Sequence, residues 1–284
     1  GDDARDLYRV MKQIWDDIKG RVDVSDFYLT GYSLGGAQSA FIAKLDNDLK
    51  LFNFKKVLLI NPPVNLYTSM NILDKMLSDN IPDGLDNFDA CFETMMAKLS
   101  RVYRQTDTLN ITNDFLYSVY RELPPKDEEM EALIGMSFRI FSSNMIFAAD
   151  VVNNAGYIVP KGRRLSSTDS TTDYFKVASQ TSFYDYFDEL FYPYFSSRQP
   201  GLTREELIGK QSLAVIEEYL ASSDKIGVFT NADDPILAPG ELDFLVRVFG
   251  KRATIYPHGG HVGNIDFRRN VIDMITFFEY RGGK

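Results

Sequence analysis

The chain has 284 residues, of which 44% are hydrophobic and 25% charged, so it can bury a large core without metal or disulfide staples. Its net charge is −9 and its only dense basic stretch is 161–164, which argues against a nucleic-acid partner, because such binding depends on clustered Lys and Arg. The lone Cys91 excludes an intrachain disulfide. No apolar run approaches the roughly 18 residues of a membrane span, so we expect no transmembrane segment. No signal sequence is visible after Gly1, and a cytoplasmic and a periplasmic location both stay open.

The N-terminal part of the sequence predicts two helices and two strands. Apolar residues at helical spacing indicate an amphipathic helix over 3–19, ended by Gly20. The apolar run 26–32 is typical of a buried strand, and the small residues of 35–45 predict a closely packed helix. The run 55–61 is continuous and rich in β-formers, as in an interior parallel strand. A strand, a helix and a second strand in succession predict a βαβ unit.

The middle of the chain has a different pattern. Residues 65–221 show mainly helical periodicity, interrupted by Pro-containing breaks, and predict no strand. Aromatic residues gather in 182–195, and the polar stretch 161–173 predicts a loop. This range is therefore expected to form a helical domain inserted into the α/β part.

The α/β pattern resumes near the C-terminus. A strand and loop are predicted over 224–234 and again over 253–261, with a helix at 241–249 between them. A closing helix is predicted over 265–281. Together with 1–64, residues 222–284 are thus expected to form one α/β core.

A candidate nucleophile lies between the predicted strand 26–32 and the helix that follows. Gly31, Ser33 and Gly35 match G-x-S-x-G, a pattern that arises by chance in about one chain in ten of this length. Its place between a strand and a helix is what a nucleophile elbow requires. The glycines permit a sharp turn, and the helix N-terminus favours developing negative charge. The N–H of Leu34 is predicted to donate to an oxyanion.

A serine hydroxyl needs a base to take its proton, and the chain has two histidines, His258 and His261. Both follow the last predicted strand. A surface turn or a metal site are other interpretations, although a spacing of three in a Gly-Gly loop is not a helical ligand pair. We predict His261 as the base, because its small neighbours let the imidazole approach the serine.

The third member of such a site is a carboxylate that orients the imidazole. Asp233 and Asp234 follow the strand predicted near 224–231. A simple Asp-Pro turn is the other interpretation, and a turn is also compatible with an orienting carboxylate. We predict Asp234, because it directly precedes Pro235.

The order Ser33, Asp234, His261, with the stretches GYSLGG, NADDPIL and GGHVG, resembles the α/β-hydrolase superfamily over roughly 20–61 and 224–281. The resemblance implies an α/β fold with the C-terminal half of a parallel hydrolase sheet, and a large helical cap at 65–221. It also implies a serine hydrolase with an acyl-enzyme intermediate and no cofactor or metal. Hydrolases of this kind have further strands and a second oxyanion donor before the nucleophile. Either this chain is a reduced member or, as we expect, a preceding segment completes the sheet.

The expected substrate is a small carboxylic ester or thioester with an apolar or lipid-like acyl part lying under the cap. Tyr32, Phe187 and Phe191 are predicted to contact it, although core packing is the other interpretation of the aromatic residues. Two other functions stay open: a non-catalytic binding protein with a hydrolase-like fold, and acyl transfer to an acceptor other than water through the same three residues.

Overall fold

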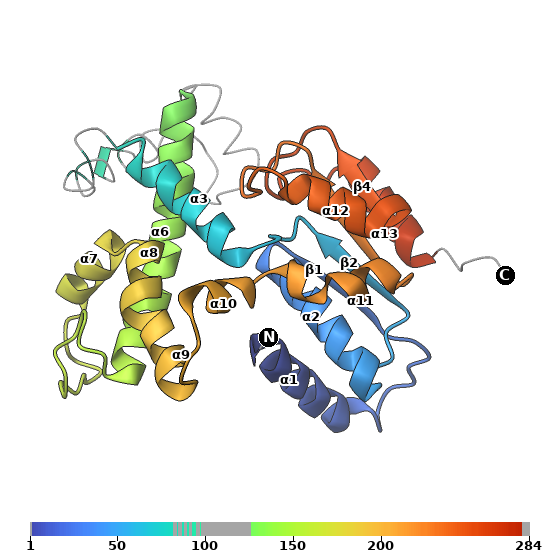
Figure 1. The fold of residues 1–284 in the computed structure, drawn as a ribbon, viewed down its shortest axis with the longest axis horizontal. Helices are drawn as coiled ribbons and strands as arrows, with labels where there is room; N and C mark the ends of the chain where they lie inside the picture. Colours follow the sequence, from blue (N-terminus) through green and yellow to red (C-terminus); the bar gives the residue numbers. More distant parts are fainter. Residues whose placement is uncertain are drawn as a thin grey trace. The chain divides into compact units, whose positions relative to one another are not determined.

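The computed structural model describes residues 2–81 and 126–279, with isolated residues between 84 and 97 (Figure 1). Contacts within the chain define two compact units. The first contains Gly1–Ser69 and Thr203–Lys284, and the second contains Met70–Leu202. Cys91 and the helical pattern expected within 98–125 lie outside the described residues.

The first unit is built on a four-stranded sheet in the order β1-β2-β3-β4. Its strands are β1 (Tyr28–Tyr32), β2 (Lys56–Ile60), β3 (Ile226–Asn231) and β4 (Ala253–Tyr256). Every neighbouring pair is parallel, so the carboxyl ends of all four strands meet at one edge. The predicted class, α/β with a parallel sheet, is confirmed.

The helices of this unit follow the order predicted from the sequence. The long ones agree with the predictions for 3–19, 35–45, 241–249 and 265–281 to within a few residues. They are α1 (Asp2–Ile18), α2 (Leu34–Leu49), α12 (Glu241–Phe249) and α13 (Arg268–Glu279). Short helical segments lie at α10 (Arg204–Gly209), η3 (Leu213–Ile216), α11 (Glu217–Ser222) and η4 (Gly250–Arg252).

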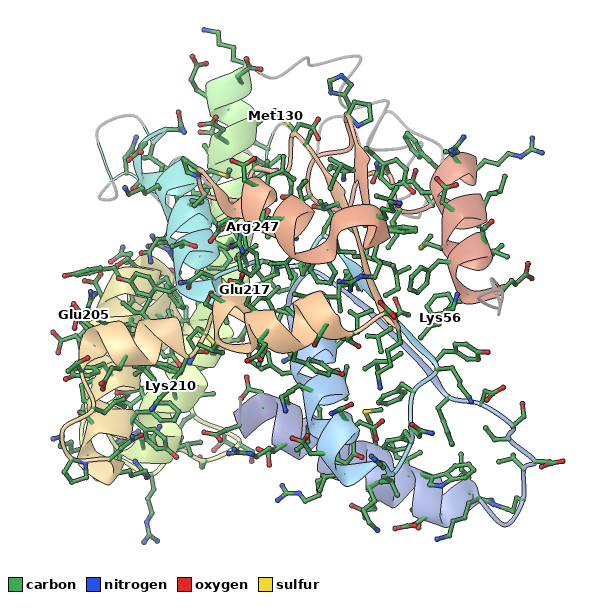
Figure 2. The ribbon with its side chains drawn as sticks, turned by 45° about the vertical axis from the view of Figure 1, so that its right-hand side comes forward. Lys56, Met130, Glu205, Lys210, Glu217 and Arg247 are labelled. Atoms are coloured by element: carbon green, nitrogen blue, oxygen red, sulfur yellow. The ribbon has the colours of Figure 1, made fainter. Side chains whose placement is uncertain are left out.

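The two faces of the sheet bury alternate residues of the same strand. Val57 and Leu59 pack into the main core with α1, α2, α11 and α12, whereas Leu58 and Ile60 face α13 on the other side. Because β2 is buried on both faces, it needs apolar residues at consecutive positions, which is the pattern that predicted it over 55–61. On the exposed side of the helical layer, Arg247 of α12 and Glu217 of α11 form an ion pair (Figure 2).

Strand β1 was predicted to be buried, and this prediction is wrong. Its residues alternate between exposed and half-buried, and Tyr32 keeps 62% of its surface exposed. The reason is its place at the edge of the sheet, where β2 is its only strand neighbour among the described residues. Apolar composition alone does not distinguish an edge strand from an interior one.

The second unit is helical in its described part. It contains the C-terminal part of α3 (Leu66–Ser78), followed by α6 (Asp127–Asn153), α7 (Thr172–Gln180), α8 (Phe183–Tyr186), the π-helical turn η2 (Phe187–Phe191) and α9 (Tyr192–Arg198). No strand occurs among the residues described between 70 and 202. Gly135 lets α6 approach α3, because a Cβ there would lie 2.4 Å from the backbone nitrogen of Leu77.

A buried ion pair crosses the helices of this unit. The Nε of the fully buried Arg139 donates to Asp74 at 2.7 Å, and the other oxygen of Asp74 accepts from the N–H of Phe183 at 2.9 Å. Burial raises the pKa of Asp74, and Arg139 opposes that rise. By length and composition, α6 could cross a membrane, which the sequence prediction missed. Its buried arginine pairs with Asp74, as expected of a helix packed inside a protein.

Candidate active site

Ser33 occupies a strained turn between β1 and α2. Its backbone has a φ of 51° and a ψ of −128°, a sparsely populated combination for a residue with a side chain. The turn is held from both sides: the Ser33 N–H donates to Ile60 O of the neighbouring strand at 2.9 Å, and the Ser33 carbonyl accepts from Gly36 N at 2.9 Å. The serine is therefore fixed by β2 and by the first turn of α2.

The glycines around Ser33 have unequal roles. A Cβ on Gly31 would lie 2.2 Å from the carbonyl oxygen of Gly35, so position 31 requires glycine. A Cβ on Gly36 would come within 3.2 Å of two carbonyl oxygens, those of Gly31 and Ile60. Gly35 has open space around its Cβ position. The sharp turn was predicted from Gly31 and Gly35, whereas the positions too crowded for a Cβ are 31 and 36.

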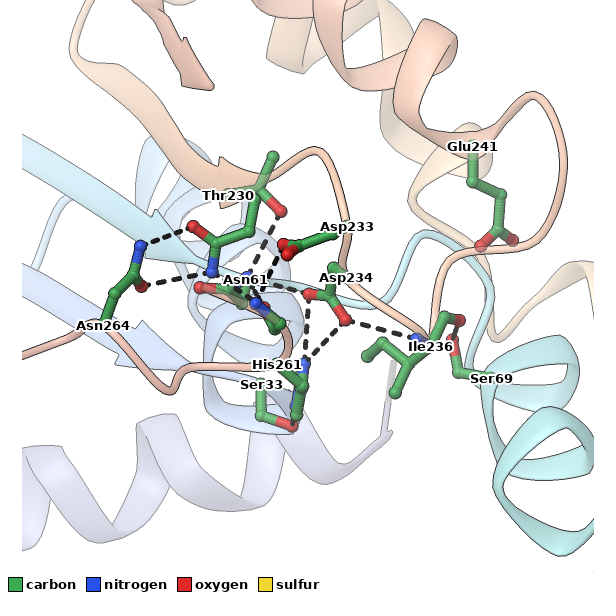
Figure 3. Close-up of polar contacts among 12 residues, drawn as sticks. Ser33, Asn61, Ser69, Thr230, Asp233, Asp234, Ile236, Glu241, His261 and Asn264 are labelled. Carbon is green, nitrogen blue, oxygen red and sulfur yellow. Dashed lines mark hydrogen bonds and ion pairs between the residues drawn. The ribbon is translucent and has the colours of Figure 1, made fainter. Parts of the chain in front are cut away.

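Three predicted side chains, those of Ser33, His261 and Asp234, are linked in that order by hydrogen bonds (Figure 3). The Nε2 of His261 lies 2.8 Å from the Ser33 hydroxyl oxygen. The Nδ1 of the same ring lies 3.1 Å from each carboxylate oxygen of Asp234. The Asp234 side chain is 0% exposed and that of His261 25% exposed. In this arrangement, the imidazole of His261 can take the serine proton, and the buried carboxylate stabilises the positive charge that the imidazole acquires.

The other histidine and the other aspartate form a separate contact. Nδ1 of His258 lies 3.4 Å from Asp233, and its side chain is 88% exposed. Asp233 accepts from the N–H of Gly260 at 2.9 Å and of Gly259 at 3.3 Å. Burial tends to raise the pKa of Asp233, but these N–H groups and His258 outweigh it, so its pKa lies below its usual value. Asp233 thus braces the loop that carries His261.

Sequence reasoning missed three asparagines beneath this site. Asn61 follows β2 and donates to Asp234 at 2.8 Å. Asn231 ends β3, and its amide donates to Gly260 O at 2.7 Å. Asn264 and Asn231 also exchange amide hydrogen bonds at 2.7 and 3.1 Å. The available signal was their position, since two of them come where a buried strand ends at the carboxyl edge.

The other predicted site residues are placed as follows. Leu34 is the first residue of α2, where N–H groups have no intrahelical acceptor. Tyr32 is the exposed last residue of β1. Phe187 is only 1% exposed within the second unit, and Phe191 packs on it with ring centroids 5.6 Å apart. The contribution of these four residues to catalysis or substrate binding stays a prediction.

The described residues contain no group of three or more His, Cys, Asp or Glu side chains placed to hold a metal ion. The two histidines considered as metal ligands instead contact different aspartates.

Comparison with known proteins gives only distant likenesses. No protein-family model and no curated protein matches the sequence. Among solved structures, the chain is similar to the thioesterase domain from the curacin biosynthetic pathway, with 10% identity and a TM-score of 0.36 over 96% of this chain and 72% of that one. It is also similar to proline iminopeptidase from Mycobacterium smegmatis, with 10% identity and a TM-score of 0.39 over 97% of this chain and 70% of that one. Likenesses this weak decide neither family nor activity.

Proposed function

We propose that this protein is a serine hydrolase of the α/β-hydrolase type, which cleaves a carboxylic ester or thioester through an acyl-enzyme. The observation that carries the proposal is the continuous path from the Ser33 hydroxyl through both ring nitrogens of His261 to the buried carboxylate of Asp234. A structural role for Ser33 or His261 would not explain why these contacts occur in this order or why the serine backbone is strained.

The chemistry follows from the order of the contacts. Ser33 Oγ attacks the carbonyl carbon of the substrate while His261 Nε2 accepts the hydroxyl proton. Asp234 stabilises the resulting imidazolium through Nδ1. The oxyanion that forms lies at the start of α2, where the N–H of Leu34 and the positive end of the helix favour it. His261 then returns the proton to the leaving alcohol or thiol, and water releases the acyl group by the reverse sequence.

The proposed substrate class rests on side chains other than Ser33, His261 and Asp234. The candidate contact beside the serine is Tyr32, the exposed last residue of β1. Aromatic side chains offer a large apolar surface, which suits an acyl chain better than a charged group. We therefore propose an ester or thioester with an apolar acyl part as the substrate class.

A covalent probe tests the nucleophile directly. A fluorophosphonate should label the native protein once, with the adduct on the peptide that contains Ser33. Labelling should be lost in S33A and kept in the control S222A, which removes an exposed hydroxyl that bonds only within α11. Equal labelling of S33A and the native protein would refute Ser33 as the nucleophile.

Turnover separates the proposal from its alternatives. The native protein should release p-nitrophenol from acyl esters in water alone. Labelling of Ser33 with release only after an added alcohol, amine or thiol acceptor would replace hydrolysis by acyl transfer. Absence of both labelling and release would refute the proposal and favour a non-catalytic binding protein.

A further inference from the structure

We propose that Asn61 is a positioning residue that sets the orientation and hydrogen bonding of Asp234 and, through it, the basicity of His261. This inference rests on the proposed function of the site. Asn61 is buried, and its amide nitrogen lies 2.8 Å from Oδ2 of Asp234. It touches neither Ser33 nor a ring nitrogen of His261 among its hydrogen bonds, so any effect on catalysis passes through the carboxylate.

The orientation of this amide follows from its surroundings. Besides Asp234, the amide nitrogen faces the Thr230 hydroxyl oxygen at 3.4 Å and the Gly260 carbonyl oxygen at 3.5 Å. A carboxylate and a carbonyl only accept hydrogen bonds. If the amide were flipped, its oxygen would face these two acceptors and could not bond to either. The donor must therefore point at Asp234, which is also the nearest of the three groups.

Asp234 depends on neutral donors. Its side chain is fully buried, and its hydrogen bonds come from the Asn61 amide, the Ile236 N–H at 3.2 Å and His261. No Lys or Arg of the described chain contacts it. A buried carboxylate without a cation keeps its charge only if hydrogen bonds replace its lost hydration. Asn61 supplies one of these bonds and draws negative charge toward the oxygen on which it acts.

The backbone around Asn61 explains why the side chain is well placed for this. Asn61 has a φ of 43°, a conformation that Asn adopts more readily than most residues, and its N–H donates to Phe229 O of β3 at 2.7 Å. The preceding Ile60 carbonyl accepts the N–H of Ser33. Two consecutive residues at the end of β2 thus hold both the candidate nucleophile and the carboxylate that orients the imidazole.

The test compares N61G with T230V. Glycine accepts the positive φ and removes only the amide, whereas T230V alters the same buried pocket without removing a donor to Asp234. N61G should lower kcat about 10–100-fold, the range expected for a lost hydrogen bond to a charged group, with KM changed less than about threefold. T230V should stay within about threefold of the native kcat.

The pH profile separates positioning from a general loss of structure. Without the amide, negative charge is no longer shared with a neutral donor, and the carboxylate attracts the protonated imidazole more strongly. The acidic limb of kcat/KM should therefore move to higher pH in N61G and stay in place in T230V. An unchanged limb, with a kcat loss equal to that of T230V, would overturn the inference. Thermal unfolding of both variants identifies any activity loss that comes from unfolding.

A readout independent of turnover keeps the inference separate from the proposed function. The proton on His261 Nδ1, held against Asp234, should give a low-field proton NMR signal in the native protein. That signal should shift or broaden in N61G, disappear in H261A and stay unchanged in T230V. If the native protein neither labels nor turns over, the proposed function fails, whereas an altered signal in N61G still supports the positioning role. An unaltered signal in N61G refutes that role.

Discussion

Replacing Asp234 by Asn, with Asp233 replaced in parallel, is the sharpest test of the charge arrangement. Both aspartates are adjacent in sequence, but one carboxylate is fully buried against His261 and the other is 43% exposed against a loop backbone. The substitution D234N keeps the shape of the side chain and removes the charge that would stabilise the imidazolium. D233N is a matched control, because an amide oxygen can still accept from Gly260.

The expected magnitude follows from the geometry. Two unit charges separated by the 3.1 Å between His261 Nδ1 and Asp234 interact with about 5 kcal/mol at an effective dielectric constant of about 20. If that stabilisation is lost in the transition state, turnover falls about 10⁴-fold, which is also the loss expected when the imidazole adopts the wrong tautomer. D233N should lose less than about tenfold, since it leaves this interaction in place.

The assay is turnover of a p-nitrophenyl ester under saturating conditions, combined with the rate of fluorophosphonate labelling. Both rates should fall together in D234N, because proton transfer from Ser33 is needed for each. Far-ultraviolet circular dichroism should show both variants folded. Equal small effects at the two positions, or a larger effect in D233N, would refute the assignment of Asp234 and with it the proposed path of contacts from Ser33 to Asp234.

Three further predictions concern the turn, the loop and the aromatic residues. The variant G31A should lose about 3 kcal/mol of unfolding free energy in urea, because its Cβ meets the Gly35 carbonyl, whereas G35A should change by less than about 1 kcal/mol; similar losses would contradict the crowding argument. The pKa of Asp233 is lower in the folded than in the unfolded protein, where it is about 4. Its carboxylate therefore stabilises the fold above about pH 4, and this contribution is lost as the pH falls through the folded-state pKa. The stability difference between the native protein and D233N should shrink on acidification. A difference that is independent of pH would rule out that linkage. Native protein should prefer medium or long acyl chains among p-nitrophenyl esters, and Y32A should weaken that preference, because Tyr32 is an exposed aromatic residue next to Ser33. A preference for acetyl esters that Y32A does not affect would exclude this ring from substrate selection. F187A should lose about 3–5 kcal/mol of stability, because Phe187 is fully buried.

Predictions made from the sequence were most successful where the pattern has a single physical cause. The continuous apolar run around Val57–Ile60 could satisfy only a strand covered on both faces, and the structure gives those residues two helical layers. The apolar run of β1 was misjudged, because burial of a strand depends on its neighbours in the sheet as well as on its own residues. The same limitation applies to Gly35: a glycine in a motif indicates a turn, but the crowding around its Cβ depends on chain that arrives from elsewhere.

Local sequence determined the positions of Ser33, Asp234 and His261 after β1, β3 and β4, and the carboxyl ends of parallel strands meet at one edge of the sheet. It also favoured His261 over His258 through the small residues beside it. Only the tertiary structure revealed the role of Asn61, whose partners Thr230, Asp234 and Gly260 lie more than a hundred residues away in the chain. An amide in a strand-end turn has many possible acceptors, and which of them it meets depends on how the strands are ordered and registered. The residues proposed to perform the chemistry can therefore be predicted from the sequence. The groups that hold them in place can be identified only from the way the strands pair in the sheet.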